Sequence, residues 1–274
     1  MKPLYEFQLP AFTGFVRPHG HYHGVVITHD TAERTLTRLG RCFLNLEHYE
    51  ARGRQGLFVP RDACTHSHTV YDDGIAIHFA PTDEWPVRST LRYQFSPPDR
   101  IDVNYHFEFE QELPAFEAFI ASYLPPGTLP PFVKVGGKWV RLTIQHDPRE
   151  QLFLPRDPAA AGVIHDGRWE VLLQRGYSYR LTEHVYDLPV MVAAFQEGFK
   201  SPVLIQMVDR RGCLALSPNV FAPAHDFSLG GIDVSPGQVI STHSRMVYCC
   251  VSGFAEVESL YKQFCTDTDE SKPP

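Results

Sequence analysis

Hydrophobic and polar residues alternate at every second position over much of the chain. The clearest case is 101–110, IDVNYHFEFE, where every odd position is apolar or aromatic and every even position is polar. A strand with this pattern buries one face and leaves the other wet. Similar patterns predict strands at 24–28, 41–47, 74–79, 89–95, 139–145, 169–174, 203–208 and 239–251. About a dozen strands at this spacing favour an all-β fold, a large antiparallel β-sandwich.

Turn-forming residues separate the predicted strands. They occur at 72–74, 96–99, 135–138, 165–167 and 235–237, each rich in Gly, Pro or Asp. The proline-rich stretch 124–131 has strand patterns on both sides, so we interpret it as a long loop within one domain. The stretch 153–162 is interpreted as a similar loop that could roof a cleft. Periodicity leaves 113–124 open between a short helix and an apolar strand.

One helix is predicted, near the C-terminus at 252–264. Ser252 can cap it, Glu256 and Glu258 favour its positive end, and apolar residues recur on one face. The segment 266–274 is predicted to be a disordered tail. The domain organisation expected from the sequence is therefore a single sandwich domain over 1–265 followed by this tail.

Composition and charge narrow the function classes. The chain of 274 residues has a formal net charge of -7 and no basic run, which argues against nucleic-acid binding. The first residues, MKPLYE, lack a secretory signal, and no run approaches the ~18 apolar residues that a membrane span requires. We therefore expect a cytoplasmic protein. Its six cysteines show no CxxC spacing, so they are predicted to be reduced thiols rather than zinc ligands.

Histidines cluster in the first part of the chain. If the stretch 18–24, PHGHYHG, is extended, its three histidines point to one side. A second alternating pair follows in 66–68, and single histidines lie on the polar faces of the strands at 74–79 and 101–110. The residues concerned are His19, His21, His23, His66, His68, His78 and His106.

Three interpretations of these histidines stay open. Imidazoles at alternate strand positions can share a metal ion, with His19, His21, His23, His66 and His68 as ligands of a divalent metal. Alternatively, neutral imidazoles can accept and donate protons on two sides of a sugar carbon, with Asp72, Asp73, Asp102 and Glu108 as acidic partners. A third interpretation is a polar sheet face whose histidines bond to carboxylates and water.

The C-terminal third contains a second polar group. In 241–248, STHSRMVY, His243 and Arg245 would share a strand face, where the guanidinium could orient a carboxylate or sugar hydroxyls. Alternatively, Arg245 pairs with Asp226 of 223–227, PAHDF, and fastens two strands together. Aromatic rings can stack on the apolar face of a sugar, and the candidates are Tyr22, Trp85, Tyr123, Trp139 and Trp169. The sequence contains no GxSxG, P-loop, GxGxxG after a strand, or HExxH motif.

The chain resembles the galactose-mutarotase-like supersandwich group. The resemblance rests on the order of 19–24, HGHYHG, then 44–49, LNLEHY, the run 91–109, 119–123, FIASY, and finally 223–227 and 245–248, RMVY. It implies a large antiparallel sandwich with a sugar-sized cleft on its concave sheet. In the mutarotases two histidines and a late glutamate act on the sugar ring; His21 or His23, and His146, match the histidines. The stretch 235–238, SPGQ, offers glutamine in place of the glutamate, which departs from the mutarotase pattern.

The leading hypothesis is a carbohydrate-active isomerase, epimerase or lyase. Its rivals are a non-catalytic carbohydrate-binding protein and a histidine-ligated, metal-dependent sugar enzyme. We expect a carbohydrate ligand, no nucleic-acid or membrane partner, and a monomer or homodimer. The predicted catalytic residues are His21, His23, His68, His146 and Arg245, and the predicted substrate-binding residues are His78, His106, Glu108, Tyr123 and Asp226.

Overall fold

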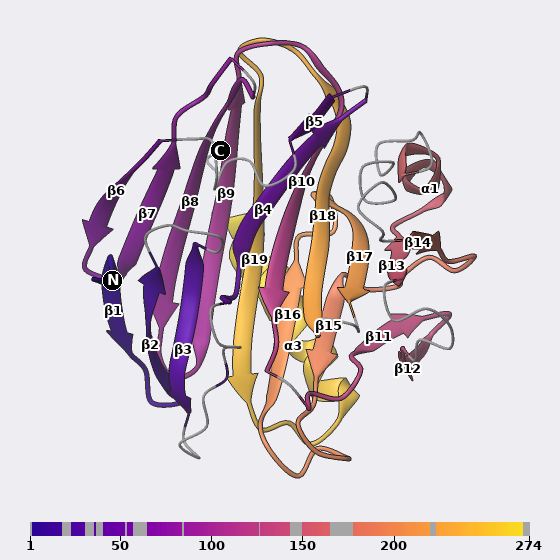
Figure 1. Ribbon diagram of the computed structural model, residues 1–274. Helices are drawn as coiled ribbons and strands as arrows, with labels where there is room; N and C mark the ends of the chain where they lie inside the picture. The colour runs from indigo at the N-terminus through magenta and orange to yellow at the C-terminus, as the bar shows by residue number, and fades with distance from the viewer. Residues whose placement is uncertain are drawn as a thin grey trace.

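The computed structural model describes residues 2–17, 23–30, 36, 41–52, 54–56, 65–83, 85–125, 127–142, 150–164, 178–219 and 223–270. In this part of the chain the strands form sheets of nine, seven and three strands, and the two large sheets stack face to face (Figure 1). The predicted large antiparallel sandwich is confirmed.

The nine-stranded sheet has the spatial order β12-β11-β15-β16-β19-β9-β8-β7-β6, and neighbouring strands are antiparallel. The strands predicted at 74–79 and 203–208 have the observed bounds. The strands of this sheet are β6 (His66–Tyr71), β7 (Gly74–Phe79), β8 (Val87–Ser96), β9 (Arg100–Phe109), β11 (Phe132–Val135), β12 (Lys138–Arg141), β15 (Val190–Ala193), β16 (Val203–Val208) and β19 (Val239–Cys249).

The seven-stranded sheet has the order β14-β13-β17-β18-β10-β4-β5. Its strands are antiparallel except for the parallel pair β13 and β14. They are β4 (Asn45–Ala51), β5 (Arg54–Gly56), β10 (Leu113–Tyr123), β13 (Glu150–Pro155), β14 (Ser178–Leu181), β17 (Cys213–Asn219) and β18 (Ala224–Val234). The three-stranded sheet contains β1 (Tyr5–Gln8), β2 (Phe12–Arg17) and β3 (Gly24–Asp30).

Strand β10 settles the open interpretation of 113–124 in favour of a strand. Its residues are buried at nearly every position because both faces of the seven-stranded sheet are covered. One face of β10 contributes to the main hydrophobic cluster, whose members lie between Phe7 and Tyr248 in the sequence. The other face packs Phe119 and Phe153 against the short helix α1 (Pro158–Ile164). A strand buried on both sides carries no alternation, so its sequence did not distinguish it from a helix.

Helix α3 (Phe254–Glu270) covers part of the outer face of the nine-stranded sheet, where Val257 and Phe264 pack on β15, β16 and β19. Ser252, predicted as the cap, contacts the first turn through a side chain: its N and Oγ both donate to the Glu256 carboxylate, at 2.8 and 3.0 Å. The helix continues to Glu270, beyond the start of the predicted disordered tail. Its extra turn is held by tertiary contact, because the Asp267 carboxylate accepts a hydrogen bond from Arg245 of β19.

Other differences from the sequence expectations are local. The stretch 153–162, expected as a loop, contains the end of β13 and most of α1, whose start is capped by Asp157 Oδ1 accepting from the Ala160 N–H at 2.8 Å. The strand predicted at 169–174 lies outside the described residues. Neither α1 nor α3 combines the length and the apolar character that a membrane crossing needs. The five described cysteines are free thiols.

Candidate functional site

The described histidines do not all converge on one pocket: His66 and His78 line a hollow of about 340 Å³ at the edge of the nine-stranded sheet, but His23, His68 and His106 are not part of its lining. His78 and His106 lie on the outer face of the nine-stranded sheet, where the register aligns both with Thr90 between them. His78 Nδ1 is 3.0 Å from Thr90 Oγ1, and His106 bonds to Ser241 Oγ at 2.9 Å and to Glu108 at 3.2 Å. These contacts match the interpretation of a polar sheet face with internally bonded histidines.

The other histidines occupy different surroundings. His66 and His68 lie on edge strand β6, paired with Phe79 and Ile77, and therefore on the opposite face of the sheet from His78. His23 is buried against the Phe79 ring, with centroids 4.8 Å apart. His19, His21 and His146 lie outside the described residues. Within the described ranges no three His, Cys, Asp or Glu side chains form a metal-binding group.

Arg245 is an ion-paired structural residue in this fold. Its Nε donates to Asp102 at 2.5 Å and its Nη1 to Asp267 at 2.7 Å, which joins β19 to β9 and to α3. The alternative pairing of Arg245 with Asp226 is wrong, because the two residues lie on different sheets. Arg245 is consequently separated from the substrate-binding candidates Tyr123 and Asp226.

Tryptophans do not provide an open stacking surface in the described part of the chain. Trp85 is fully buried beside Phe116. Trp139 stacks on Phe254 with centroids 4.7 Å apart and donates to Glu258 through Nε1 at 2.9 Å. Both rings thus serve packing, and Trp169 and Tyr22 lie outside the described residues.

A polar row crosses the outer face of the seven-stranded sheet. The register aligns Asn45 of β4, Ala121 of β10, Asp226 of β18 and Ser217 of β17 side by side. Ala121 belongs to the hydrophobic cluster that packs under α1, so the side chains of this row point to the outer face of the sheet. All three polar members are buried. Gln151 of β13 reaches the same row, with its Nε2 3.4 Å from Asp226 Oδ2.

Glu47 joins this row through a β-bulge. The pairing of β10 with β4 shifts between Ile120, which faces Leu46, and Phe119, which faces His48. Glu47 is the extra residue, and bulges of this kind re-aim side chains and occur often beside active sites. The Tyr123 hydroxyl lies 2.9 and 2.7 Å from the two carboxylate oxygens of Glu47.

Arg41 completes this group from the loop before β4. Its guanidinium carbon lies 4.6 Å from the centre of the Tyr123 ring, within the range of a cation–π contact. The cluster of Arg41, Glu47, Tyr123, Gln151 and Asp226 is called the carboxylate cluster below.

Strained backbone immediately precedes these residues. Leu44 adopts a left-handed conformation with φ of 56°, which is uncommon for a residue with a branched side chain. Its N–H donates to Ser122 Oγ at 2.9 Å, and its carbonyl accepts from the Tyr93 hydroxyl at 2.8 Å. Ser122 Oγ also accepts from Gln206 Nε2 at 2.6 Å. Hydrogen bonds from both large sheets therefore stabilise the strained conformation of Leu44, which positions Asn45 and Glu47. Backbone strain of this kind occurs most often at functional sites.

The pKa values of these residues differ from those of carboxylates on a face exposed to water. Burial raises the pKa of Asp226 well above its ordinary value, and the neighbouring Glu47 carboxylate raises it further. Burial, and then Glu47, also raise the pKa of the Tyr123 hydroxyl. The next residue, His225, points to the interior, where burial lowers its pKa to about 3 and keeps the imidazole neutral. Strongly perturbed groups gathered in one place mark candidate sites for acid–base chemistry.

The same face carries unused hydrogen-bonding capacity. Asp226 Oδ1, both amide atoms of Asn45, and the hydroxyls of Ser217 and Ser228 are buried and have no hydrogen-bond partner among the described residues. Buried polar atoms are nearly always paired in folded proteins. The row therefore carries unused hydrogen-bond donors and acceptors beside a pair of carboxyl groups.

Sequence reasoning found two of the five residues of this cluster. Tyr123 and Asp226 were predicted to bind substrate, and the structure brings them together. Glu47 lay inside the 44–49 motif but was given no role, and Arg41 and Gln151 were missed. No local signal marks them, because the bulge that aims Glu47 and the β13–β17–β18 order that brings Gln151 near Asp226 are properties of long-range pairing.

Comparisons with known proteins identify the fold. No family model and no curated protein sequence matches this chain. Among solved structures, a protein from Escherichia coli K12 with a proposed aldose 1-epimerase activity aligns with a TM-score of 0.52 and 10% identity, covering 90% of this chain and 99% of its own. A protein from Synechocystis sp. PCC 6803 aligns at a TM-score of 0.50 and 8% identity, covering 92% and 97%.

An α-N-acetylgalactosaminidase from Bifidobacterium bifidum, in complex with GalNAc, aligns at a TM-score of 0.57 and 10% identity. The alignment covers 97% of this chain but only 39% of that enzyme. At these identities the likeness concerns the fold alone. The resemblance to the galactose-mutarotase-like supersandwich group is thus confirmed for the architecture.

Proposed function

We propose that this protein is a carbohydrate-active enzyme that moves protons at a sugar ring, with the carboxylate cluster as its catalytic site. The observation that carries the proposal is the buried pair Glu47 and Asp226, one of which has a raised pKa, with Tyr123 bonded to the other. A carboxyl group whose raised pKa favours its protonated form, held near a second carboxyl group, provides an acid–base pair of the kind used by enzymes acting on sugars.

The roles follow from the surroundings of each group. Asp226, favoured in its protonated form, donates a proton to the ring oxygen of an aldose. Glu47 accepts the proton of the anomeric hydroxyl, so the bond between the anomeric carbon and the ring oxygen breaks and an open-chain aldehyde forms. Reclosure on the other face of the aldehyde gives the opposite anomer. Tyr123 orients the Glu47 carboxylate through its hydrogen bond.

Binding is assigned to the unpaired polar row. Asn45, Ser217 and Ser228 offer one amide and two hydroxyls to sugar hydroxyl groups. The fold likeness supports a sugar as the ligand class, and the proposed activity of the Escherichia coli protein makes anomer interconversion the first reaction to test. His21 and His146, which lie outside the described residues, remain proposed catalytic residues.

The test is anomer exchange measured by NMR on D-galactose and D-glucose, with ultraviolet detection of unsaturated products from polysaccharides as the lyase arm. Asp226→Asn and Glu47→Gln are each expected to lower turnover by about 10²- to 10⁴-fold, the contribution of a positioned acid or base. His68→Asn, on the edge of the other sheet, is expected to leave turnover unchanged.

Three outcomes would change the proposal. Full activity in both carboxyl variants would contradict the assigned roles. Loss of activity only in His68→Asn, or in a His21→Asn variant with the carboxyl variants active, would favour the histidine mechanism instead. Saturable sugar binding without any product would establish the rival function, a non-catalytic carbohydrate-binding protein.

A further inference from the structure

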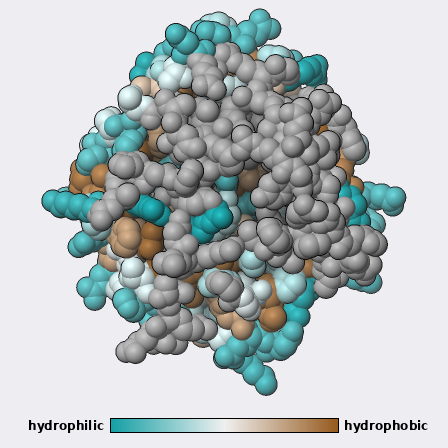
Figure 2. All heavy atoms as spheres, viewed as in Figure 1, coloured by the Kyte–Doolittle hydropathy of each residue, from teal (hydrophilic) through white to brown (hydrophobic). Residues whose placement is uncertain are grey.

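A second polar hollow lies on the opposite side of the molecule. It has a volume of about 390 Å³ and opens between the outer face of the nine-stranded sheet and the last turns of α3. Its floor includes Gln94, Asn104 and His243, and Phe264 and Asp267 of α3 form a wall. Figure 2 shows hydrophilic residues around the edge of the molecule in the view of Figure 1. The hollow is distinct from the carboxylate cluster, because its strands β8, β9 and β19 belong to the nine-stranded sheet and those of the cluster to the seven-stranded sheet.

Strand register builds the floor of this hollow. Gln94, Asp102 and Arg245 form one row across β8, β9 and β19, and Asn104 and His243 form the next row. Side chains at these positions share one sheet face, so five planar polar groups lie within two neighbouring rows. Amide, carboxylate, imidazole and guanidinium groups are thus presented together on a rigid surface.

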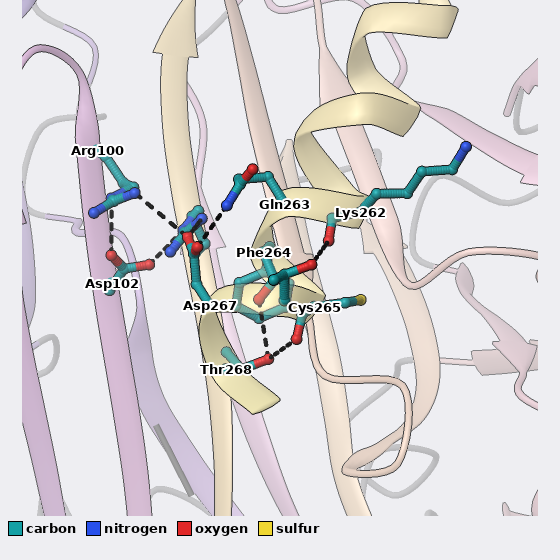
Figure 3. Close-up of polar contacts among 10 residues, drawn as sticks. Arg100, Asp102, Lys262, Gln263, Phe264, Cys265, Asp267 and Thr268 are labelled. Carbon is teal, nitrogen blue, oxygen red and sulfur yellow. Dashed lines mark hydrogen bonds and ion pairs between the residues drawn. The ribbon is translucent and has the colours of Figure 1, made fainter. Parts of the chain in front are cut away.

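Ion pairs fix the wall against the floor. Arg245 bonds to Asp102 and Asp267, and Arg100 lies 3.0 Å from Asp102 and 3.6 Å from Asp267 (Figure 3). The guanidinium carbon of Arg245 also lies 5.2 Å from the centre of the Phe264 ring. Two arginines and two aspartates balance in charge, which leaves a preorganised hollow whose polar groups need no rearrangement to meet a ligand.

Several polar atoms of the hollow are available. Asn104 lines the hollow, and its Oδ1, which is shielded from solvent, makes no hydrogen bond with any described residue. Gln94 uses its Nε2 to reach Asp73 at 3.0 Å, and Arg245 uses Nε and Nη1 for its two aspartates. The contacts described for these side chains leave Gln94 Oε1 and Arg245 Nη2 for a ligand.

The lining selects a class of ligand. The three aspartates of the lining outnumber the two arginines that pair with Asp102 and Asp267, so the negative charge left on Asp209 would repel an anion. The described residues form no metal-binding group here. A floor of amides and charged groups disfavours an apolar molecule. We propose that this hollow is a second, non-catalytic site for a neutral sugar, whose hydroxyls would bond to Asn104, Gln94 and Arg245. This inference does not depend on the proposed function, because it uses a different face and no acid–base pair.

The test uses methyl β-D-glucopyranoside and methyl β-D-galactopyranoside, which bind without anomer interconversion. Saturation-transfer NMR on the full chain would give their affinities for the wild type and four variants. Asn104→Leu keeps the side-chain volume and removes its polar atoms, and Gln94→Leu does the same at an exposed position. Thr69→Val, on the same sheet face but outside the hollow, is the matched control, and Asp226→Asn disables the carboxylate cluster.

We expect at least one glycoside to bind the wild type, Asp226→Asn and Thr69→Val alike. Asn104→Leu should weaken binding about tenfold, the effect of one well-placed hydrogen bond, and Gln94→Leu should act in the same direction. Methyl β-D-glucuronide should bind less tightly than the neutral glycosides because of the three aspartates. The inference is overturned if neither glycoside binds, if both leucine variants bind as the wild type does, or if Asp226→Asn abolishes all binding. A melting curve checks that each variant is folded. If Asn104→Leu is unfolded, the binding result for Gln94→Leu decides the test.

Discussion

Replacing Ser122 by alanine tests how the fold holds the strand that carries Glu47. Ser122 is fully buried between the sheets, and its hydroxyl accepts hydrogen bonds from the Leu44 N–H and from Gln206 Nε2. Alanine at this position leaves two buried donors unpaired, and each costs about 1–3 kcal/mol. Allowing for partial relaxation, we expect Ser122→Ala to lower the free energy of unfolding by about 2–4 kcal/mol, a large share of the 5–15 kcal/mol typical of a folded domain.

The assay is urea denaturation followed by tryptophan fluorescence, for which fully buried Trp85 provides a signal from the core. Ser228→Ala is the matched control: Ser228 is equally buried, but its hydroxyl has no hydrogen-bond partner among the described residues. Its loss should therefore change stability by less than about 0.5 kcal/mol. A double variant with Gln206→Leu should recover part of the cost by removing one donor. A cost for Ser122→Ala that is no larger than that of Ser228→Ala would refute the reasoning.

Three further predictions concern charge. Asp226 has a raised pKa in the folded state, so folding favours its protonated form and stability falls as pH rises above the unfolded value of about 4; Asp226→Asn should be more stable than the wild type at pH 8, with the difference closing near pH 3 in denaturation experiments. His225 has a folded pKa of about 3, so the wild type should lose up to about 1.4 kcal/mol per pH unit as pH falls below about 6.5, and a His225→Gln variant that kept this slope would exclude His225 as its source. Asp267→Asn should loosen α3, seen as faster hydrogen exchange in the helix and a loss of about 1 kcal/mol that shrinks with added salt; exchange unchanged in α3 would show that its apolar face alone holds it.

The sequence alone determined the strands that have one wet face. In 101–110 and 89–95 the side-chain period of two is local information, because each strand must bury one face whatever it pairs with. It also marked the helix at the C-terminus through its cap and apolar face. It did not resolve β10, since covering both faces of the seven-stranded sheet erased the alternation.

The site was decided by the tertiary structure. Tyr123 and Asp226 lie 103 positions apart, and only the β10–β18 register makes them neighbours on one face, while the bulge in β4 aims Glu47 at Tyr123. Likewise, Arg245 meets Asp102 rather than Asp226, because β19 pairs with β9 in the other sheet. Residue types can be read directly from the sequence, and they suggested a polar site of a size that suits a sugar. Which of them meet depends on strand order and register, and these are fixed by packing between segments far apart in the chain.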